Sequence, residues 1–251
     1  MSTYASMPAG AMTLKKASPF GIAVETPAGD LHLHTIICLG RNYAAHAKEQ
    51  GHEVNERPII FTKLPGTARL HGDDIVIPPA AIEPDSGGNQ IDYEAELVVI
   101  IGKEMRNVSE ADALSHVLGY TCGNDVTARW WQRNGSGGQY VRGKSFDSFC
   151  PIGPWVIPAS SIPDPQSLRI TCRVNNEQRQ DSNTSDMIFP VAKFISDLSR
   201  GITLYPGTVI MTGTPEGVGA AMKPSQWLKP GDVVEVEVEK IGVLRNAVQA
   251  E

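Results

Sequence analysis

Residues 91–102 read Ile-Asp-Tyr-Glu-Ala-Glu-Leu-Val-Val-Ile-Ile-Gly and carry the strongest structural signal in the chain. Within them, Leu97–Ile101 is an uninterrupted apolar run, which is typical of a buried strand. The run is far too short to cross a membrane, which takes about 20 apolar residues in a helix. We therefore expect a strand over Ile91–Ile101, with Glu94 and Glu96 at the edge of the core.

Short strand candidates recur on both sides of this segment, and the 24 glycines and 18 prolines favour many turns between them. Besides Ile91–Ile101, they are Thr35–Leu39, Pro58–Lys63, Asp74–Pro78, Leu168–Val174, Thr208–Thr212 and Asp232–Val238. Helical patterns are fewer: Tyr43–Gln50, Ser109–Leu118 with a Ser-x-x-Asp capping pattern, and Pro190–Ser199 after the cap candidates Thr184 and Ser185. Because regular βαβ alternation is missing, the pattern predicts one α+β, mainly β domain.

The segment Val233–Glu239 shows strict alternation of apolar and acidic residues. Valines at 234, 236 and 238 alternate with glutamates at 235, 237 and 239. Successive side chains of a strand point to opposite faces. The alternation therefore predicts a half-buried strand with an acidic face in solvent, rather than an array of metal ligands.

Composition and charge narrow the class of protein. Hydrophobic residues make up 41% of the 251 residues and charged residues 20%, which is ordinary for a folded chain and excludes wholesale disorder. The formal net charge is −6, whereas a nucleic-acid partner requires clustered Lys and Arg. No apolar stretch approaches the length of a membrane span. We therefore expect neither a nucleic-acid partner nor a membrane partner.

The cysteines and the first residues indicate the compartment. Cys38, Cys122, Cys150 and Cys172 are far apart and show no zinc-ligand spacing, so we expect four reduced thiols in a cytosol-like compartment. Met1–Val24 contains no arginine and no continuous apolar segment of the kind found in secretory signals. The sequence therefore predicts a cytoplasmic protein, with a mitochondrial location as the weaker alternative.

Acidic side chains in two segments are candidate metal ligands. Glu94 and Glu96 are two residues apart, so on a strand they point to the same face. Adjacent carboxylates repel unless a cation or shared proton compensates, and a hard divalent metal is one explanation; solvated glutamates at a strand entrance are the other. Asp125, in a Gly-Asn-Asp turn, is either a third ligand or the cap of a following helix with Arg129 and Gln132. Three carboxylates would leave about three positions for substrate and water.

Two further groups could take part in acid–base chemistry. His46 and Glu49 are three residues apart, so on a helix they are neighbours and could form a dyad, although an incidental solvated pair has the same spacing. Lys144 lies between the glycine-rich stretch 135–143 and the apolar stretch 146–151. It is either a surface charge or a lysine that points into a pocket and neutralises an enolate or carboxylate.

Six blocks of this sequence together resemble the fumarylacetoacetate hydrolase family, in particular its short members that contain only the catalytic domain. They are Cys38–Tyr43, Asp92–Glu96, Asn124–Arg129, Gly143–Asp147, Phe149–Trp155 and Thr212–Gly219, and they occur in the family's order. The resemblance implies a catalytic domain over residues 35–251, with an N-terminal extension over 1–34 packed on it. It also implies a mixed β-sheet roll with a few short helices, usually assembled as a homodimer.

The resemblance also implies roles for particular residues. The family's metal ligands, with Mg²⁺ or Mn²⁺ as the usual occupant and Ca²⁺ as a structural substitute, are matched by Glu94, Glu96 and Asp125. The residues that match a dyad on a mobile lid and a lysine that stabilises an oxyanion or enolate are His46, Glu49 and Lys144. The expected contacts to substrate are Arg41, Tyr43, Arg129, Gln132, Gly213 and Thr214.

Members of the family act on small β-diketo or α-keto acids through a metal-bound enolate. Because the His46–Glu49 dyad is retained, which favours water activation, we first expect a hydrolase that cleaves a C–C bond of an acylpyruvate-like β-diketo acid. The alternative is an oxaloacetate decarboxylase or tautomerase, or an isomerase or dehydratase on a related keto acid. A silent relative that survives as a binding or structural dimer is disfavoured by the complete set of site residues. Trp130–Trp131 departs from the family pattern, and it either makes the pocket more apolar or packs a helix on the sheet.

Overall fold

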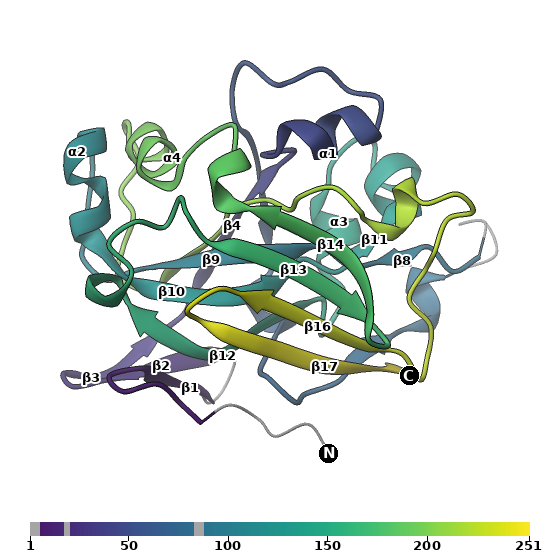
Figure 1. Ribbon diagram of the computed structural model, residues 1–251, viewed down its shortest axis with the longest axis horizontal. Helices are drawn as coiled ribbons and strands as arrows, with labels where there is room; N and C mark the ends of the chain where they lie inside the picture. Colours follow the sequence, from purple (N-terminus) through teal and green to yellow (C-terminus); the bar gives the residue numbers. More distant parts are fainter. Residues whose placement is uncertain (1–5, 18–20, 83–87) are drawn as a thin grey trace.

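The computed structural model describes residues 6–17, 21–82 and 88–251. The described strands form a large curled mixed sheet, a five-stranded sheet packed against it and a separate two-stranded pair, with short helices at the rim (Figure 1). Parallel and antiparallel neighbours both occur in the large sheet. This architecture confirms the predicted mainly β, mixed-sheet roll with a few short helices.

The large sheet has the strand order β3-β2-β1-β12-β10-β9-β15-β4-β5, and β6 pairs with β12 outside this path. Its strands are β1 (Met12–Lys16), β2 (Ile22–Thr26), β3 (Gly29–His32), β4 (Thr35–Gly40), β5 (Ile59–Lys63), β6 (Ala68–Arg69), β9 (Ala95–Ile101), β10 (Val117–Asn124), β12 (Cys150–Pro158) and β15 (Thr208–Met211). Two strands from the second half of the chain, β12 and β15, therefore lie between strands of the first half.

The five-stranded sheet has the order β14-β13-β16-β17-β7. Its strands are β7 (Ile75–Ile77), β13 (Arg169–Val174), β14 (Glu177–Asn183), β16 (Val233–Val238) and β17 (Gly242–Ala250), and the separate pair is β8 (Ile91–Asp92) with β11 (Thr127–Ala128). The described α-helices are α1 (Ala44–Glu49), α2 (Glu110–Ala113), α3 (Val141–Lys144) and α4 (Val191–Leu198). A π-helical turn over Trp131–Gly135 precedes α3.

Strand β9 shows why the apolar run is continuous. Leu97 and Val99 lie in the core between the two sheets, together with residues of β13 and β16. Val98 and Ile100 point to the opposite face and pack in a second core with residues of β2 and β4. Both faces of the strand are therefore buried, and a polar residue at any of these positions would lose its contact with water.

The predicted strand Ile91–Ile101 is interrupted, because it divides into β8 and β9 around Tyr93 and Glu94. The N–H of Tyr93 donates to the side chain of Asp92 at 2.9 Å, and that of Glu94 donates to the side chain of Asn124 at 3.0 Å. These two N–H groups bond side chains instead of a neighbouring strand. The break lets β8 pair with β11 while β9 pairs with β10 and β15.

The three predicted helices form, with changed limits. Ser109 accepts a hydrogen bond from the N–H of Asp112 at 3.2 Å, which confirms the predicted cap, but α2 is shorter than expected. Helix α4 begins after Pro190, so the caps predicted at Thr184 and Ser185 are wrong. Those two residues instead belong to a separate 3₁₀ turn.

The alternating segment forms β16, with residues 234, 236 and 238 buried as predicted. The N-terminal strands widen the large sheet: β1 pairs antiparallel with β12, Met12 lies opposite Val156, and β2 and β3 continue outward (Figure 1). This pairing gives the first described residues a backbone contact with the middle of the chain.

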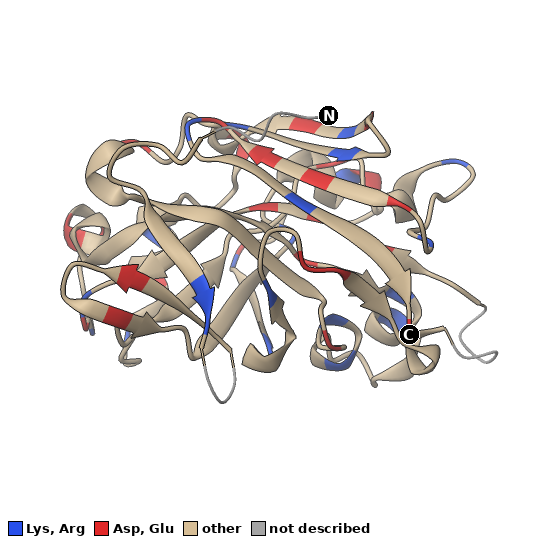
Figure 2. Cartoon of the chain, turned by 90° about the horizontal axis from the view of Figure 1, so that it is seen from below, with Lys and Arg blue, Asp and Glu red and all other residues tan. Residues whose placement is uncertain are grey.

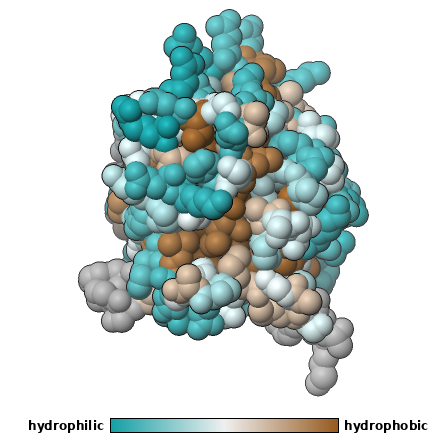
Figure 3. Space-filling model, turned by 90° about the vertical axis from the view of Figure 1, so that its left-hand side faces the viewer, coloured by the Kyte–Doolittle hydropathy of each residue, from teal (hydrophilic) through white to brown (hydrophobic). Residues whose placement is uncertain are grey.

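The surface carries both charge signs and one visible apolar band. Acidic and basic positions are interspersed over the chain (Figure 2). On the side where α2 and α4 lie in Figure 1, apolar residues show between hydrophilic areas (Figure 3). None of the helices in the described residues is both long and apolar enough to cross a lipid bilayer.

Candidate active site

Three buried carboxyl groups meet where the predicted strand is broken. Glu94 lies between β8 and β9, Glu96 lies in β9, and Asp125 directly follows β10. Because β9 and β10 are antiparallel neighbours, with Glu96 opposite Gly123, the start of one strand lies beside the end of the other. The N–H of Asp125 donates to the carbonyl of Glu94 at 2.9 Å. Ligand oxygens of the three carboxyl groups consequently lie within 4.8 Å of one another.

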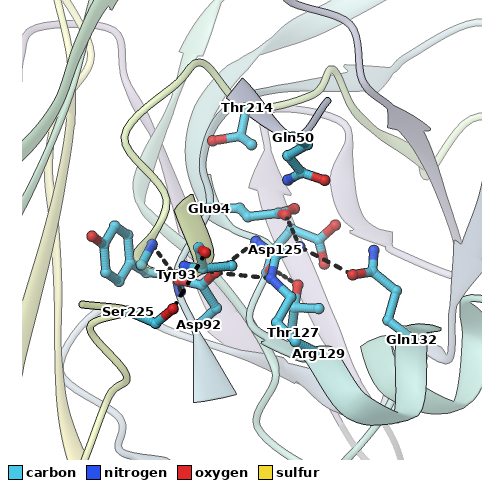
Figure 4. A network of polar contacts seen from close by, with 12 residues as sticks. Gln50, Asp92, Tyr93, Glu94, Asp125, Thr127, Arg129, Gln132, Thr214 and Ser225 are labelled. Carbon is cyan, nitrogen blue, oxygen red and sulfur yellow. Dashed lines mark hydrogen bonds and ion pairs between the residues drawn. The ribbon is translucent and has the colours of Figure 1, made fainter. Parts of the chain in front are cut away.

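Buried cations surround these carboxyl groups. The Nζ atom of Lys144 lies 2.6 Å from both Glu94 Oε2 and Asp125 Oδ2, and Arg129 Nη1 lies 2.7 Å from Glu94 Oε1. Lys63 at the end of β5 donates to the other oxygen of Asp125. Burial raises the pKa of Glu94, but the charges of Lys144 and Arg129 outweigh burial and hold this pKa below its usual value. Figure 4 shows Glu94, Asp125 and Arg129 in one polar network.

A further carboxyl group, that of Asp92, orients Arg129. The Nε atom of Arg129 donates to Asp92 Oδ2 at 2.8 Å. Asp92 also accepts hydrogen bonds from the N–H groups of Gly219 at 2.8 Å and Ala220 at 3.0 Å. This carboxylate therefore ties the loop after β15 to the floor of the site.

Glu96 has no such cation among the described residues. One of its oxygens accepts a hydrogen bond from the N–H of Gly213 at 2.8 Å. Burial, together with the charges of Asp125 and Glu94, raises the pKa of Glu96 well above its usual value. With Asp92, the buried cluster contains four carboxyl groups. Its three cations are Lys63, Arg129 and Lys144, so one carboxyl group has no cation to compensate it.

This donor set fits a hard divalent cation. Mg²⁺ and Mn²⁺ prefer oxygen ligands, and Glu94, Glu96 and Asp125 supply three from within one 4.8 Å group. Lys144 already bridges two of these carboxylates, which shows that the position favours positive charge. A bound divalent cation would convert the surplus negative charge of the buried group into a surplus positive charge. Such a site would attract an anionic substrate.

His46 and Glu49 form the predicted pair on α1. His46 is buried, and its Nδ1 lies 2.7 Å from Glu49 Oε1. Because a carboxylate only accepts hydrogen bonds, this contact places a proton on Nδ1, and in the neutral imidazole Nε2 then carries the lone pair. The side-chain amide of Gln50 lies 3.1 Å from Nε2 and donates to it. The other oxygen of Glu49 accepts a hydrogen bond from the N–H of Gly217 at 2.9 Å, so the dyad is held against the loop after β15.

One pocket of about 300 Å³ joins the dyad to the carboxyl cluster. Its volume lies at the lower end of the range for small-molecule sites. The predicted site residues that line it are Arg41, His46, Glu94, Arg129, Gln132, Lys144 and Thr214. The structure therefore brings a base, a carboxylate and an ammonium group to one small-molecule cavity.

Other predicted residues lie near the pocket without facing it. Glu96 and Asp125 lie behind the pocket lining, and the N–H of Gly213 donates to Glu96. Tyr43 is fully buried and does not line the pocket, and its hydroxyl has no hydrogen-bond partner among the described residues. Among the residues that do line it, Thr214 accepts a hydrogen bond from Gln180 at 2.8 Å.

The helix predicted directly after Asp125 begins later in the chain, because β11 comes first. Asp125 is therefore not a helix cap. The tryptophans that follow do not line this pocket. Trp131 donates from its indole N–H to the carbonyl of Ala80 at 2.9 Å and stacks edge-on with Phe146. Of the two interpretations of Trp130–Trp131, the structure agrees with packing rather than with a more apolar pocket.

Sequence reasoning missed several side chains of the site. Gln50 and Arg133 line the pocket. Gln50 follows His46 by four positions, and Arg133 follows Arg129 by four. On a helix this spacing puts two side chains on the same face, so it could have identified both residues. Lys63 was missed because its partner Asp125 lies 62 positions away. No local pattern connects two residues so far apart.

Comparison with known proteins places these features in a family. A family model described as fumarylacetoacetate (FAA) hydrolase C-terminal matches residues 35–249. Oxaloacetate tautomerase FAHD2A, mitochondrial, from Bos taurus is 44% identical over 213 residues, which cover 85% of this chain and 66% of that protein. The chain thus spans slightly less than two thirds of the length of this curated relative.

Solved structures share the fold at lower identity. Fumarylpyruvate hydrolase from Pseudomonas aeruginosa, in complex with Mn²⁺ and pyruvate, is 32% identical with a TM-score of 0.79, and the match covers 94% of this chain and 99% of that one. The 5-carboxymethyl-2-hydroxymuconate delta-isomerase from Mycobacterium smegmatis is 32% identical with a TM-score of 0.76, covering 96% and 94%. With the family model matching most of its length, this chain belongs to the fumarylacetoacetate hydrolase family of enzymes.

Proposed function

We propose that this chain is a metal-dependent enzyme that moves a proton at the carbon beside the keto group of an α-keto acid, as in keto–enol tautomerisation. The observation that carries the proposal is that His46, oriented by Glu49, lines the same pocket as Glu94 and Lys144. A base and a centre that stabilises negative charge can therefore act on one small molecule. The 44% identity to a protein named oxaloacetate tautomerase supports this reaction over the hydrolysis first expected from the sequence.

His46 is the proton acceptor in this proposal. Its Nε2 carries the lone pair, and the carboxylate of Glu49 stabilises the imidazolium that forms when Nε2 takes the proton. The amide of Gln50 bonds Nε2 in this structure, so it has to turn away before the base reaches substrate. The same Nε2 then returns the proton to oxygen or carbon, which completes the tautomerisation.

Lys144 stabilises the negative charge that develops on the keto oxygen. An ammonium group has three N–H donors, and Glu94 and Asp125 each accept one of them at 2.6 Å. The third is available to an enolate oxygen in the pocket. A divalent metal held by Glu94, Glu96 and Asp125 would add Lewis-acid polarisation of the substrate's keto oxygen.

The test is the rate of interconversion of keto and enol oxaloacetate, followed by the ultraviolet absorbance of the enol, with Mg²⁺ or Mn²⁺ and then with EDTA. We expect acceleration that requires metal and that falls by about 10²- to 10⁴-fold in His46→Ala. Lys48→Ala is the matched control, because Lys48 is exposed on the same helix and does not line the pocket. An enzyme that leaves the interconversion at its spontaneous rate would contradict the proposal.

Hydrolysis of a C–C bond is the second candidate function. In this case His46 Nε2 would take a proton from water, and the departing enolate would meet the same Lys144 ammonium. The solved fumarylpyruvate hydrolase, at 32% identity and with a TM-score of 0.79, supports this candidate. Cleavage of an acylpyruvate in parallel with the oxaloacetate assay separates the two reactions, and decarboxylation of oxaloacetate is read in the same samples.

Three expectations from the sequence stay predictions. They are the homodimeric assembly, the cytoplasmic location and the boundary between an N-terminal extension over 1–34 and a catalytic domain over 35–251. Light scattering of the purified chain would test the first of these directly.

A further inference from the structure

Cationic side chains gather at the exposed end of the pocket. Glu94 and Lys144 form a buried end, whereas Arg41 is half-buried and His52 and Arg133 are exposed. Arg41 occupies the turn between β4 and α1, with a φ of 54° in the left-handed region. Because these residues come from separate segments of the chain, only the fold brings their charges to the pocket.

The two arginines of this end are not engaged in ion pairs within the described residues. Arg129, by contrast, lies within 2.8 Å of the carboxylates of Asp92 and Glu94. The acidic residue in the pocket lining, Glu94, is already bonded to Arg129 and Lys144. Arg41 and Arg133 therefore bring positive charge to the cavity without an ion-paired carboxylate of their own in the described part of the chain.

The pKa shifts of His52 and Arg133 agree with a concentration of positive charge at this end of the pocket. Desolvation lowers the pKa of His52, and the nearby charges of Arg41 and Arg133 lower it further. Desolvation and the charge of Arg129 also lower the pKa of Arg133, and they outweigh the opposing charges of Asp92 and Glu94. Like charges held together cost free energy unless an anion joins them.

We infer that Arg41 and Arg133 form a second anion subsite that binds the distal carboxylate of a keto diacid. The inference rests on the proposed function, in which the keto acid end of the same molecule lies at Glu94 and Lys144. Guanidinium groups bind carboxylates through paired N–H donors, which gives geometric selectivity as well as attraction. The site thereby selects short α-keto dicarboxylates over monocarboxylates of the same length.

The test is calorimetric binding to the Mg²⁺-loaded protein of two five-carbon probes, 2-oxoglutarate and 2-oxopentanoate, with oxalate as a reference. Oxalate fills only the keto acid end. We expect wild type to bind the diacid at least about tenfold more tightly than the monoacid, since a charged hydrogen bond is worth about that factor or more. Arg133→Met and Arg41→Met should weaken diacid binding by about 10- to 100-fold and leave oxalate and monoacid binding within about threefold.

Two further variants sharpen the result. Arg57→Met removes an exposed arginine of the stretch 51–57 that does not line the pocket, and it should leave all three affinities unchanged. Arg133→Lys keeps the charge without the paired donors, so it should recover only part of the diacid affinity. Equal binding of diacid and monoacid by wild type would overturn the inference, as would an Arg133→Met variant that weakens oxalate as much as diacid. Failure of oxalate itself to bind would instead count against the proposed function.

Discussion

The carboxyl cluster and the α1 segment face each other across one pocket, but they are built in opposite ways. Glu94, Glu96 and Asp125 are at most 5% exposed and lie on or directly beside β9 and β10, in the middle of the large sheet. Helix α1 has six residues, has no side-chain cap, and is followed by the largely exposed stretch 51–57. Its polar tie to the loop after β15 is the hydrogen bond from the N–H of Gly217 to Glu49.

This difference indicates in which of the two regions a substitution affects activity and stability together. In the cluster, Glu94 and Asp125 each compensate buried cations, so removal of either leaves an unpaired charge inside the protein. In α1, the dyad can be removed while the sheets keep their contacts. We therefore expect variants of the cluster to lose both stability and activity, and variants of α1 to lose activity alone.

The largest effect is expected for Asp125→Ala. It leaves the ammonium groups of Lys63 and Lys144 without a shared partner, which should cost about 3–5 kcal/mol of the free energy of unfolding. Activity should fall by about 10³-fold or more, because a metal ligand and a partner of Lys144 are lost together. Urea unfolding and turnover measure the two effects. The control is Glu237→Ala, which removes an exposed carboxylate of β16; full activity and metal content in Asp125→Ala would refute the assignment.

The next effect, in His46→Ala, should separate activity from stability. We expect a loss of about 10²- to 10⁴-fold in turnover with unfolding free energy lowered by only about 1 kcal/mol, since no buried ion pair of the cluster is broken. Mn²⁺ affinity, measured by electron paramagnetic resonance, should stay as in wild type. If His46→Ala lost its metal, the two regions would be one unit and the comparison would be wrong.

A smaller effect is expected for Glu49→Gln. The amide oxygen can still accept the hydrogen bond from Nδ1 of His46, but it carries no charge to stabilise an imidazolium. We expect about a tenfold loss of turnover with little change in KM. A variant as impaired as His46→Ala would show instead that the contact from Gly217 to Glu49 is what holds α1 in place.

The smallest effect concerns motion of α1. Because one short helix and an exposed loop make up residues 42–57, amide hydrogens there should exchange faster than those of β9 in the empty protein. Oxalate with saturating Mg²⁺ should slow this exchange by about tenfold, while β9 stays unchanged. Equal exchange with and without oxalate, followed by mass spectrometry, would mean that this segment is not a lid over the ligand.

Local sequence patterns were enough for the elements whose environment is encoded within a few residues. The apolar run of β9, the Ser109 cap of α2 and the alternation of β16 all appear as predicted. Each depends on a period of two or on a capping distance of three residues, which a single segment contains. The i,i+3 spacing of His46 and Glu49 similarly yields a 2.7 Å contact.

The family motifs identified Glu94, Glu96 and Asp125 as the three candidate ligands. No local pattern could have shown that these carboxylates lie close together in the fold. The break between β8 and β9 escaped prediction because Asn124, thirty residues away, takes the N–H of Glu94.

Only the tertiary structure decided which charges compensate one another. Lys63 reaches Asp125 across 62 positions, and Lys144 reaches Glu94 across 50. The pairing of strands sets these distances, and it depends on contacts summed over both cores rather than on any one segment. Burial then makes each partner necessary, because a charge removed from water is stable only beside its opposite.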